Sequence, residues 1–281
     1  MTHPHPHRPD VEDAARWYDD AVEMVGLDRD RAARDERLDP GRVRTALDDV
    51  WEALAWGWVT QRPPAELEAL VVHAVEVLRA GLDTSTGRPL GPLDVERLVT
   101  AALLAGDVEA AGRAAARDVP PPVEPVEWRA AALTALVRRD DAAAGAAVER
   151  LRAVVADPTT APFVADWLAH LDEVADAVLR RDQAAFDDAL AARARVVARV
   201  HRTARMRRRW TGLLDRYAIA LARVAEQRGL VVPPDVPVVP AELLAVVGAA
   251  AARVAAPPSR ARDRRWPWWG RRTRAGGGRA V

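Results

Sequence analysis

The sequence predicts an all-α protein of antiparallel helical hairpins, in a tetratricopeptide-like or α-solenoid-like array, with a disordered C-terminal tail. Two observations support this fold class. Apolar residues recur at three- and four-residue spacing along most of the 281 residues, which favours amphipathic helices over strands. A short phrase that ends in Asp also occurs three times, each time before a segment rich in small residues. A chain of this length has room for a full core without disulfides.

Helix start and stop signals divide the N-terminal third of the chain. Asp10 is placed to cap a helix that has its apolar residues on one face. Asp39-Pro40 combines an N-cap with proline at the first helical position. Pro63-Pro64 ends that segment, and Gly81 ends the next one. The predicted helices therefore cover residues 11–25, 28–38, 40–62 and 64–80.

The recurring phrase is the most informative internal pattern. Its copies are Leu103–Asp107, Leu136–Asp140 and Val178–Asp182, spaced by 33 and then 42 residues. Asp is a good N-cap, and small residues three and four positions apart allow helices to approach closely. Each copy is therefore interpreted as the turn of an αα-hairpin. Coincidence in an Ala-rich sequence is the alternative, because the full tetratricopeptide pattern is absent.

The C-terminal part predicts two further helices around an extended piece. A helix is expected from Met206 to about Arg228, and Val231–Val239 must be extended because of its prolines. Pro240 then opens a last helix to about Ala255. The predicted organisation is a disordered N-terminus (1–9), one helical domain (10–256) and a disordered Arg- and Trp-rich tail (257–281).

Composition excludes several chemistries and indicates a charge asymmetry. The sequence lacks Cys, Lys and Asn, which excludes thiolate sites, a P-loop lysine and N-glycosylation. With no signal peptide or membrane-length apolar run, a cytoplasmic protein is expected. Residues 1–190 contain 21 Arg against 36 acids, whereas residues 191–209 contain 8 Arg and no acid. An acidic body attracts a basic partner or binds its own basic segments.

An acidic, Trp-rich stretch is the candidate partner-binding site. Trp56 lies off the helix face that Trp51 and Trp58 share, so at least one ring is expected at the surface. An exposed Trp can anchor a protein interface, but core packing is the favoured interpretation of these tryptophans. The six candidate residues are Asp48, Asp49, Trp51, Glu52, Trp56 and Trp58.

Two aspartate-rich phrases resemble the magnesium-binding motifs of all-helical prenyl-transfer enzymes. Asp19-Asp20 and Asp48-Asp49 begin these phrases, which lie 29 residues apart. In the enzymes the two motifs lie far apart in sequence and face one aromatic-lined cavity, so solvated helix faces explain this pair better. The histidines at positions 3, 5 and 7 lie in the predicted disordered terminus, and His73, His170 and His201 are isolated. No catalytic residue, metal or cofactor is therefore predicted.

Two basic segments have alternative interpretations. Residues 193–209 contain eight arginines that could bind phosphates, but no aromatic residue interleaves with them before Trp210. Internal pairing with the acidic body is the favoured interpretation, and no specific nucleic-acid site is predicted. The tail after Arg260 combines arginines with Trp266-Pro267-Trp268-Trp269, which suits a weak contact with a membrane surface or an anionic polymer. A dispensable extension is the alternative there.

The stretch from Arg181 to Leu244 resembles the C-terminal part of a family of helical bacterial proteins, immunity family forty-nine, which protect a cell from its own polymorphic toxins. The matching residues are Arg181-Asp182, Phe186, Ala189, Leu190, His201, Tyr217–Ala222, Gly229–Val232, Pro240 and Leu243-Leu244. The resemblance implies an inhibitor that occludes a toxin and has no catalytic residues.

These observations lead to a functional expectation. The leading hypothesis is a non-enzymatic binding protein, of the immunity type, whose acidic body meets a basic toxin domain. A tetratricopeptide-like scaffold or regulatory adaptor that binds peptides in a concave groove is the second hypothesis. The metal-dependent prenyl-transfer enzyme is the third, and it requires the four aspartates to converge.

Overall fold

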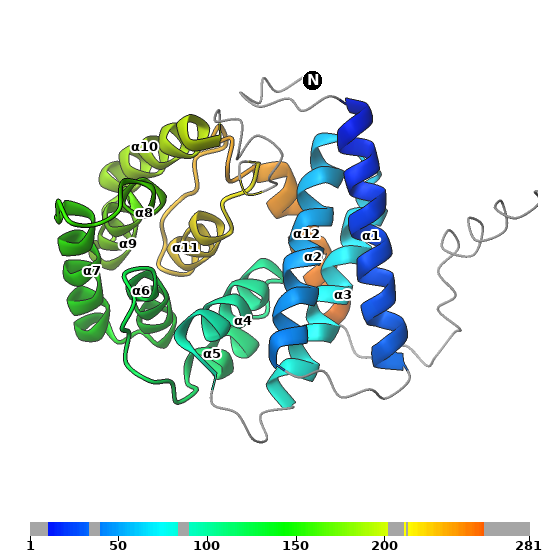
Figure 1. Cartoon of the computed structure of the whole chain (residues 1–281), viewed down its shortest axis with the longest axis horizontal. Coiled ribbons are helices and arrows are strands. Elements are labelled where there is room, and N and C mark those ends of the chain that lie inside the picture. Colours follow the sequence, from blue (N-terminus) through cyan, green and yellow to red (C-terminus); the bar gives the residue numbers. More distant parts are fainter. Residues whose placement is uncertain (1–10, 34–39, 84–89, 202–210, 212, 256–281) are drawn as a thin grey trace, which may run out of the picture.

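A computed structural model describes residues 11–33, 40–83, 90–201, 211 and 213–255 of the chain (Figure 1). These residues form helices joined by turns and loops, with no strand among them, so the predicted all-α class is confirmed. The termini that were predicted to be disordered, 1–9 and 257–281, lie outside the described residues. The helices are α1 (Val11–Ala33), α2 (Pro40–Val59), α3 (Pro64–Asp83), α4 (Pro92–Leu104), α5 (Val108–Ala115), α6 (Glu127–Arg138), α7 (Asp141–Ala156), α8 (Pro162–Leu168), α9 (Leu171–Arg180), α10 (Gln183–His201), α11 (Arg216–Gln227) and α12 (Ala241–Ala255).

The three recurring phrases form the turns of three helical hairpins. In each phrase the Asp side chain accepts a hydrogen bond from a backbone N–H three residues later, at 2.9 Å for Asp107, 3.0 Å for Asp140 and 3.1 Å for Asp182. Each Asp also donates its own backbone N–H to a carbonyl oxygen five residues earlier. This double contact ends one helix and begins the next. The phrases therefore have one local structure, a capped turn between two helices.

The residue before each Asp has a positive φ. Gly106 meets this requirement without strain at φ 71°, whereas Arg139 and Arg181 adopt φ values of 58° and 55°. The left-handed residue reverses the chain, so that α4 packs on α5, α6 on α7 and α9 on α10.

The hairpins are arranged in an arc whose inner side is occupied by α11 (Figure 1). Helix α11 contacts α4, α6 and α9, and its buried residues surround the helix axis. A helix that is apolar on all sides is stable only when other elements enclose it. The concave side of the arc, which a peptide-binding scaffold would leave open, is therefore filled by the chain itself.

Helices α1, α2, α3 and α12 pack side by side next to the arc, with α1 at the outer edge (Figure 1). Gly57 allows three of them to meet closely, because a Cβ atom there would lie 2.7 Å from both Tyr18 of α1 and Leu67 of α3. The Tyr18 hydroxyl donates to Glu66 at 3.0 Å, and Arg62 lies over its ring. These contacts fix α1 on α2 and determine which face of α1 points outward.

Two predicted helix boundaries were wrong. The predicted helices 11–25 and 28–38 are one helix as far as Ala33, since Gly26 lies within α1 without ending it. The helix predicted from Met206 begins at Arg216, because Asp215 caps it through the backbone N–H groups of residues 217 and 218. Residues 202–210 and 212 lie outside the described residues.

Candidate binding surface

The structure places two of the candidate tryptophans in the core. Trp51 and Trp56 are 3% and 1% exposed, and Trp58 is half-buried. The Trp56 ring packs against Trp17 of α1 with 4.7 Å between the ring centroids. Helix α1 and other helices therefore cover Trp51 and Trp56, which agrees with the core-packing interpretation. Partner contact through Trp58 stays a prediction.

The acidic candidates of α2 make contacts within the molecule. Asp48 accepts a hydrogen bond from Arg216 Nη1 at 2.5 Å and lies 3.5 Å from Arg97 Nε. Glu52 accepts the Trp56 indole N–H at 3.3 Å. The Asp48 contacts join α2 to α4 and α11, whereas the Glu52 contact lies within α2. Partner binding by the acidic candidates stays a prediction.

Asp49 is in an unfavourable environment for a negative charge. Its Oδ2 atom is buried and has no hydrogen-bond partner among the described residues. Burial, followed by repulsion from Asp28, Glu52 and Asp48, raises the pKa of Asp49 from its ordinary 3.8 to about 6. A carboxylate in this position weakens the contact between α1 and α2 at neutral pH.

This environment makes the effect of Asp49→Asn on stability dependent on pH. Asp49 has a higher pKa in the folded state than in the unfolded state, so its ionisation destabilises the fold fully above pH 6, and this penalty disappears as the pH falls towards 3.8. The neutral amide should raise the free energy of unfolding by about 1–2 kcal/mol at pH 7.5, a value that allows for solvent screening at this half-buried site. Urea unfolding at pH 7.5 and pH 4 measures this gain, which should be small at pH 4. The matched variant Asp20→Asn, at an exposed position of α1, should show no gain, and a destabilised Asp49→Asn protein at pH 7.5 would contradict the assignment.

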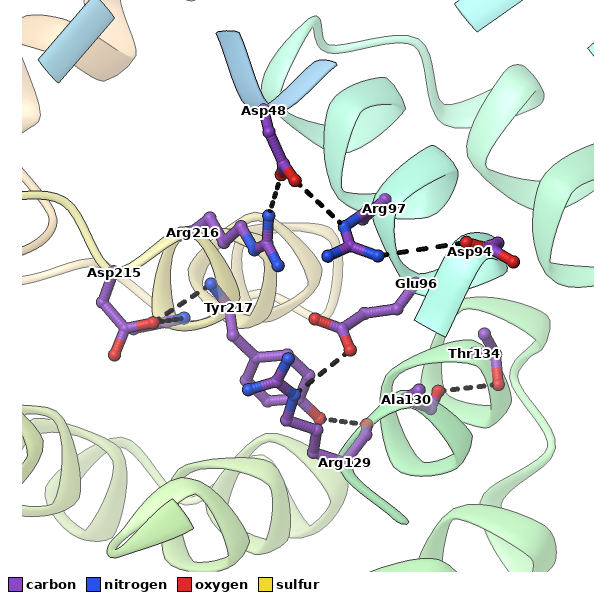
Figure 2. A network of polar contacts seen from close by, with 11 residues as sticks. Asp48, Asp94, Glu96, Arg97, Arg129, Ala130, Thr134, Asp215, Arg216 and Tyr217 are labelled. Carbon is purple, nitrogen blue, oxygen red and sulfur yellow. Dashed lines mark hydrogen bonds and ion pairs between the residues drawn. The ribbon is translucent and has the colours of Figure 1, made fainter. Parts of the chain in front are cut away.

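A polar network joins four helices around the N-terminus of α11 (Figure 2). Asp48 of α2 bridges Arg97 of α4 and Arg216 of α11. Deeper in the molecule, Arg129 of α6 donates through Nε to Glu96 of α4 at 3.1 Å, and both side chains are buried. The Tyr217 hydroxyl donates to the backbone carbonyl of Arg129, and burial is the main cause that raises the pKa of Tyr217 well above its ordinary value. The network thus positions α11 inside the arc.

A second buried ion pair attaches α10 to the cap of α11. Arg193 Nε donates to Asp215 Oδ2 at 2.6 Å, and Arg193 Nη1 donates to the carbonyl oxygens of Trp167 and Ala169. Burial alone would raise the pKa of Asp215, but attraction and hydrogen bonding from Arg193 outweigh it, so the pKa is lowered. Sequence analysis missed this pair, because the two residues lie 22 positions apart and no local pattern links them.

The two aspartate-rich phrases do not form one site. Asp19 contacts Arg62 at 3.3 Å, whereas Asp48 contacts Arg97 and Arg216 at the N-terminus of α11. Asp20 points to solvent. Within the described ranges, no group of three or more His, Asp or Glu is placed to hold a metal ion. The convergence that the prenyl-transfer hypothesis requires is therefore not found.

The helical histidines have separate surroundings. His201 contacts the Val197 carbonyl through Nδ1 and Thr211 Oγ1 through Nε2, both at 3.0 Å. His170 lies 2.8 Å from Glu173. These two rings are hydrogen-bonded within the chain. His73 differs, because its ring nitrogens are buried with no hydrogen-bond partner in the described part of the chain.

The basic segment that begins at Arg193 is partly used inside the molecule. Arg193 is buried on Asp215, and Arg199 contacts Asp166 of α8 at 2.6 Å, which agrees with the internal pairing expected for these residues. Arg195 is exposed. The remaining arginines, at positions 202, 205 and 207–209, lie outside the described residues, as does the tail with its tryptophans.

A small hollow lies between α2 and α4, next to Asp48. Its volume of about 10 Å³ has room for about one water molecule. The lining residues are Val43, Arg44, Leu47, Leu90, Asp94, Arg97 and Leu98. A hollow of this size is suited to a bridging water rather than to an organic substrate.

The outer face of α1 combines exposed apolar and acidic side chains. Met24 and Leu27 are 41% and 44% exposed and adjacent, because they lie three positions apart on a helix. The exposed acids Asp20, Glu23 and Asp30 share this face. We call these five residues the α1 ridge. Sequence analysis missed it because the first predicted helix ended at residue 25, before Leu27 and Asp30, whereas α1 continues to Ala33.

Comparison with protein-family models, curated proteins and solved structures finds no match for this chain. The resemblance to the immunity family therefore stays a prediction. Among the described helices, none is long and apolar enough to cross a membrane.

Proposed function

We propose that this protein is a non-enzymatic binding protein that neutralises a basic bacterial toxin by occlusion. The observation that carries this proposal is the α1 ridge, where two exposed apolar side chains lie among three exposed carboxylates. Acidic side chains attract a basic partner and increase its association rate, while desolvated apolar side chains slow its dissociation. The excess of acids in residues 1–190 extends this attraction over the body.

The residues of the family resemblance support the same proposal in a different way. Most of them are core residues of α10, α11 and α12, such as Phe186, Tyr217 and Leu243. They specify the helical framework and leave the partner-binding surface unspecified. An immunity protein of this design keeps a common core and recognises its own toxin through exposed residues elsewhere, here on α1.

The scaffold hypothesis has less support. It expects a continuous concave surface, and the arc of hairpins does form one, but α11 occupies it. A peptide would have to bind to another face.

Co-expression with a basic toxin encoded by a neighbouring gene tests the proposal. Cells that produce the toxin should grow when this chain is also produced, and toxin activity in a purified mixture should fall as the chain approaches one equivalent. Equal growth arrest with and without the chain, at matched expression of the folded protein, would contradict the proposal. A toxin from another locus is the control, and it should remain active.

A further inference from the structure

We infer that the α1 ridge docks an amphipathic helix of the basic partner, with an apolar side chain seated on Met24 and Leu27 and basic side chains on both sides. This inference rests on the proposed function only for the basic character of the partner. The geometry comes from the packing of α1, α2, α3 and α12, which leaves one side of α1 uncovered by the other three helices.

The position of α1 favours a helical occupant. Helices α12, α3, α2 and α1 pack in sequence, each against the next, and α1 is at the edge of this row (Figure 1). A terminal helix in such a row ordinarily presents a polar outer face, because nothing covers it. Here Met24 and Leu27 interrupt the polar face. One more helix, supplied by a partner, would continue the row and bury both side chains.

The dimensions of the ridge match a short helical contact. From Asp20 to Asp30 the ridge extends about 15 Å along α1, which is about three helical turns. A facing helix packs through side chains three and four residues apart, so its apolar stripe would meet Met24 and Leu27 at the centre. Met is unbranched and adapts to different shapes, which suits it to a contact with a partner side chain.

The charges around the two apolar residues determine the chemistry of the occupant. Asp20 and Glu23 lie toward one end of the ridge, and Asp30 lies at the other, all exposed. Asp19, beside them, already contacts Arg62. An occupant with arginine or lysine before and after its central apolar side chains, along the helix axis, complements these carboxylates, whereas an acidic helix is repelled.

A designed peptide tests the inference in the full-length protein. The probe is a fluorescent helical peptide of about 18 residues, five helical turns, with leucines on one face at its centre and arginines on the same face toward both ends. Fluorescence anisotropy should show saturable binding, and a peptide of the same composition in scrambled order should bind at least about tenfold more weakly. Binding should weaken as salt is raised, because exposed charges are screened.

Substitutions then locate the peptide. Asp20→Arg with Glu23→Arg, or Met24→Ala with Leu27→Ala, should each weaken binding by about tenfold or more. The matched controls are Asp188→Arg, an exposed acid on α10, and Val108→Ala, an exposed apolar residue on α5, and both should bind like the wild type. Circular dichroism melting checks that all variants remain folded, as expected for exposed positions. A photoreactive leucine in the peptide should crosslink to α1.

Several results would overturn the inference. Equal binding of the scrambled peptide, unchanged binding to both ridge variants, or crosslinks away from α1 would each do so. Tighter binding after Trp266, Trp268 and Trp269 are replaced with Ser would show that the chain's own tail is the occupant. Failure of the proposed function can be distinguished from failure of this inference. A protein that binds the peptide at the ridge but does not neutralise the toxin supports the docking surface and contradicts the proposed function. If both ridge variants still protect cells from the toxin, the protein retains the function and the ridge is not the surface that binds the toxin.

Discussion

Replacing Asp215 with Ala is expected to lower the free energy of unfolding by about 3–5 kcal/mol at neutral pH, because it removes one member of a buried ion pair. The partner, Arg193, is 2% exposed and would keep its charge in the interior with only carbonyl oxygens as acceptors. The substitution also removes the side-chain cap of α11, whose backbone N–H groups at Tyr217 and Ala218 lose their acceptor. Urea unfolding followed by circular dichroism measures the change.

The contribution of the ion pair can be separated from that of the cap. Asp107 caps α5 through one backbone N–H and forms no ion pair among the described residues, so Asp107→Ala should cost only about 1 kcal/mol. The difference between the losses of stability in the two variants measures the cost of leaving the buried Arg193 without its ion-pair partner. A loss of similar size in both variants would contradict the role assigned to the Arg193–Asp215 pair.

The pH dependence provides an independent check on the same pair. The pKa of Asp215 is lowered in the folded protein, so the carboxylate contributes its full stability above the ordinary value of 3.8 and loses it as the pH falls through the folded-state pKa. The difference in free energy of unfolding between the wild type and Asp215→Ala should therefore be constant from about pH 5 to pH 8 and become smaller in acid. A difference that grows in acid would contradict the ion-pair assignment.

The hairpins could be predicted from the sequence because their signals are local. Asp140 and Asp182 cap helices within three residues of themselves, and the small residues that follow determine how closely the paired helices approach. These signals do not depend on the rest of the molecule. They identified the turns although Arg139 and Arg181 occupy positions that favour glycine.

The candidate site could not be predicted in the same way, because exposure is a long-range property. Periodicity places Trp51 and Trp58 on one face of α2 and Trp56 off it, but several helices pack around α2 and bury both faces there. Asp48 shows the same limit, since its partner Arg216 lies 168 positions later in the chain. A pattern within one helix predicts which side chains share a face. It does not predict which elements cover that face.

Replacing Trp56 with Ala is expected to lower the free energy of unfolding by about 3–5 kcal/mol, because a large core side chain is removed and its space is only partly refilled. Trp56 is 1% exposed, packs against Trp17 and donates its indole N–H to Glu52. The control is Trp58→Ala, at a half-buried position of the same helix, and it should cost less than half as much. Urea unfolding measures both variants.

The same two variants decide whether the tryptophans of α2 act in the core or at an interface. If Trp56 stabilises α1 on α2, the Trp56→Ala protein that remains folded at low temperature should still bind the designed peptide through the α1 ridge, with an affinity reduced only by its unfolded fraction. A Trp56→Ala protein of wild-type stability that no longer binds would place this ring at the partner interface, against the packing with Trp17. Stability and binding must therefore be measured on the same sample, because a core residue affects binding only through the population of folded protein.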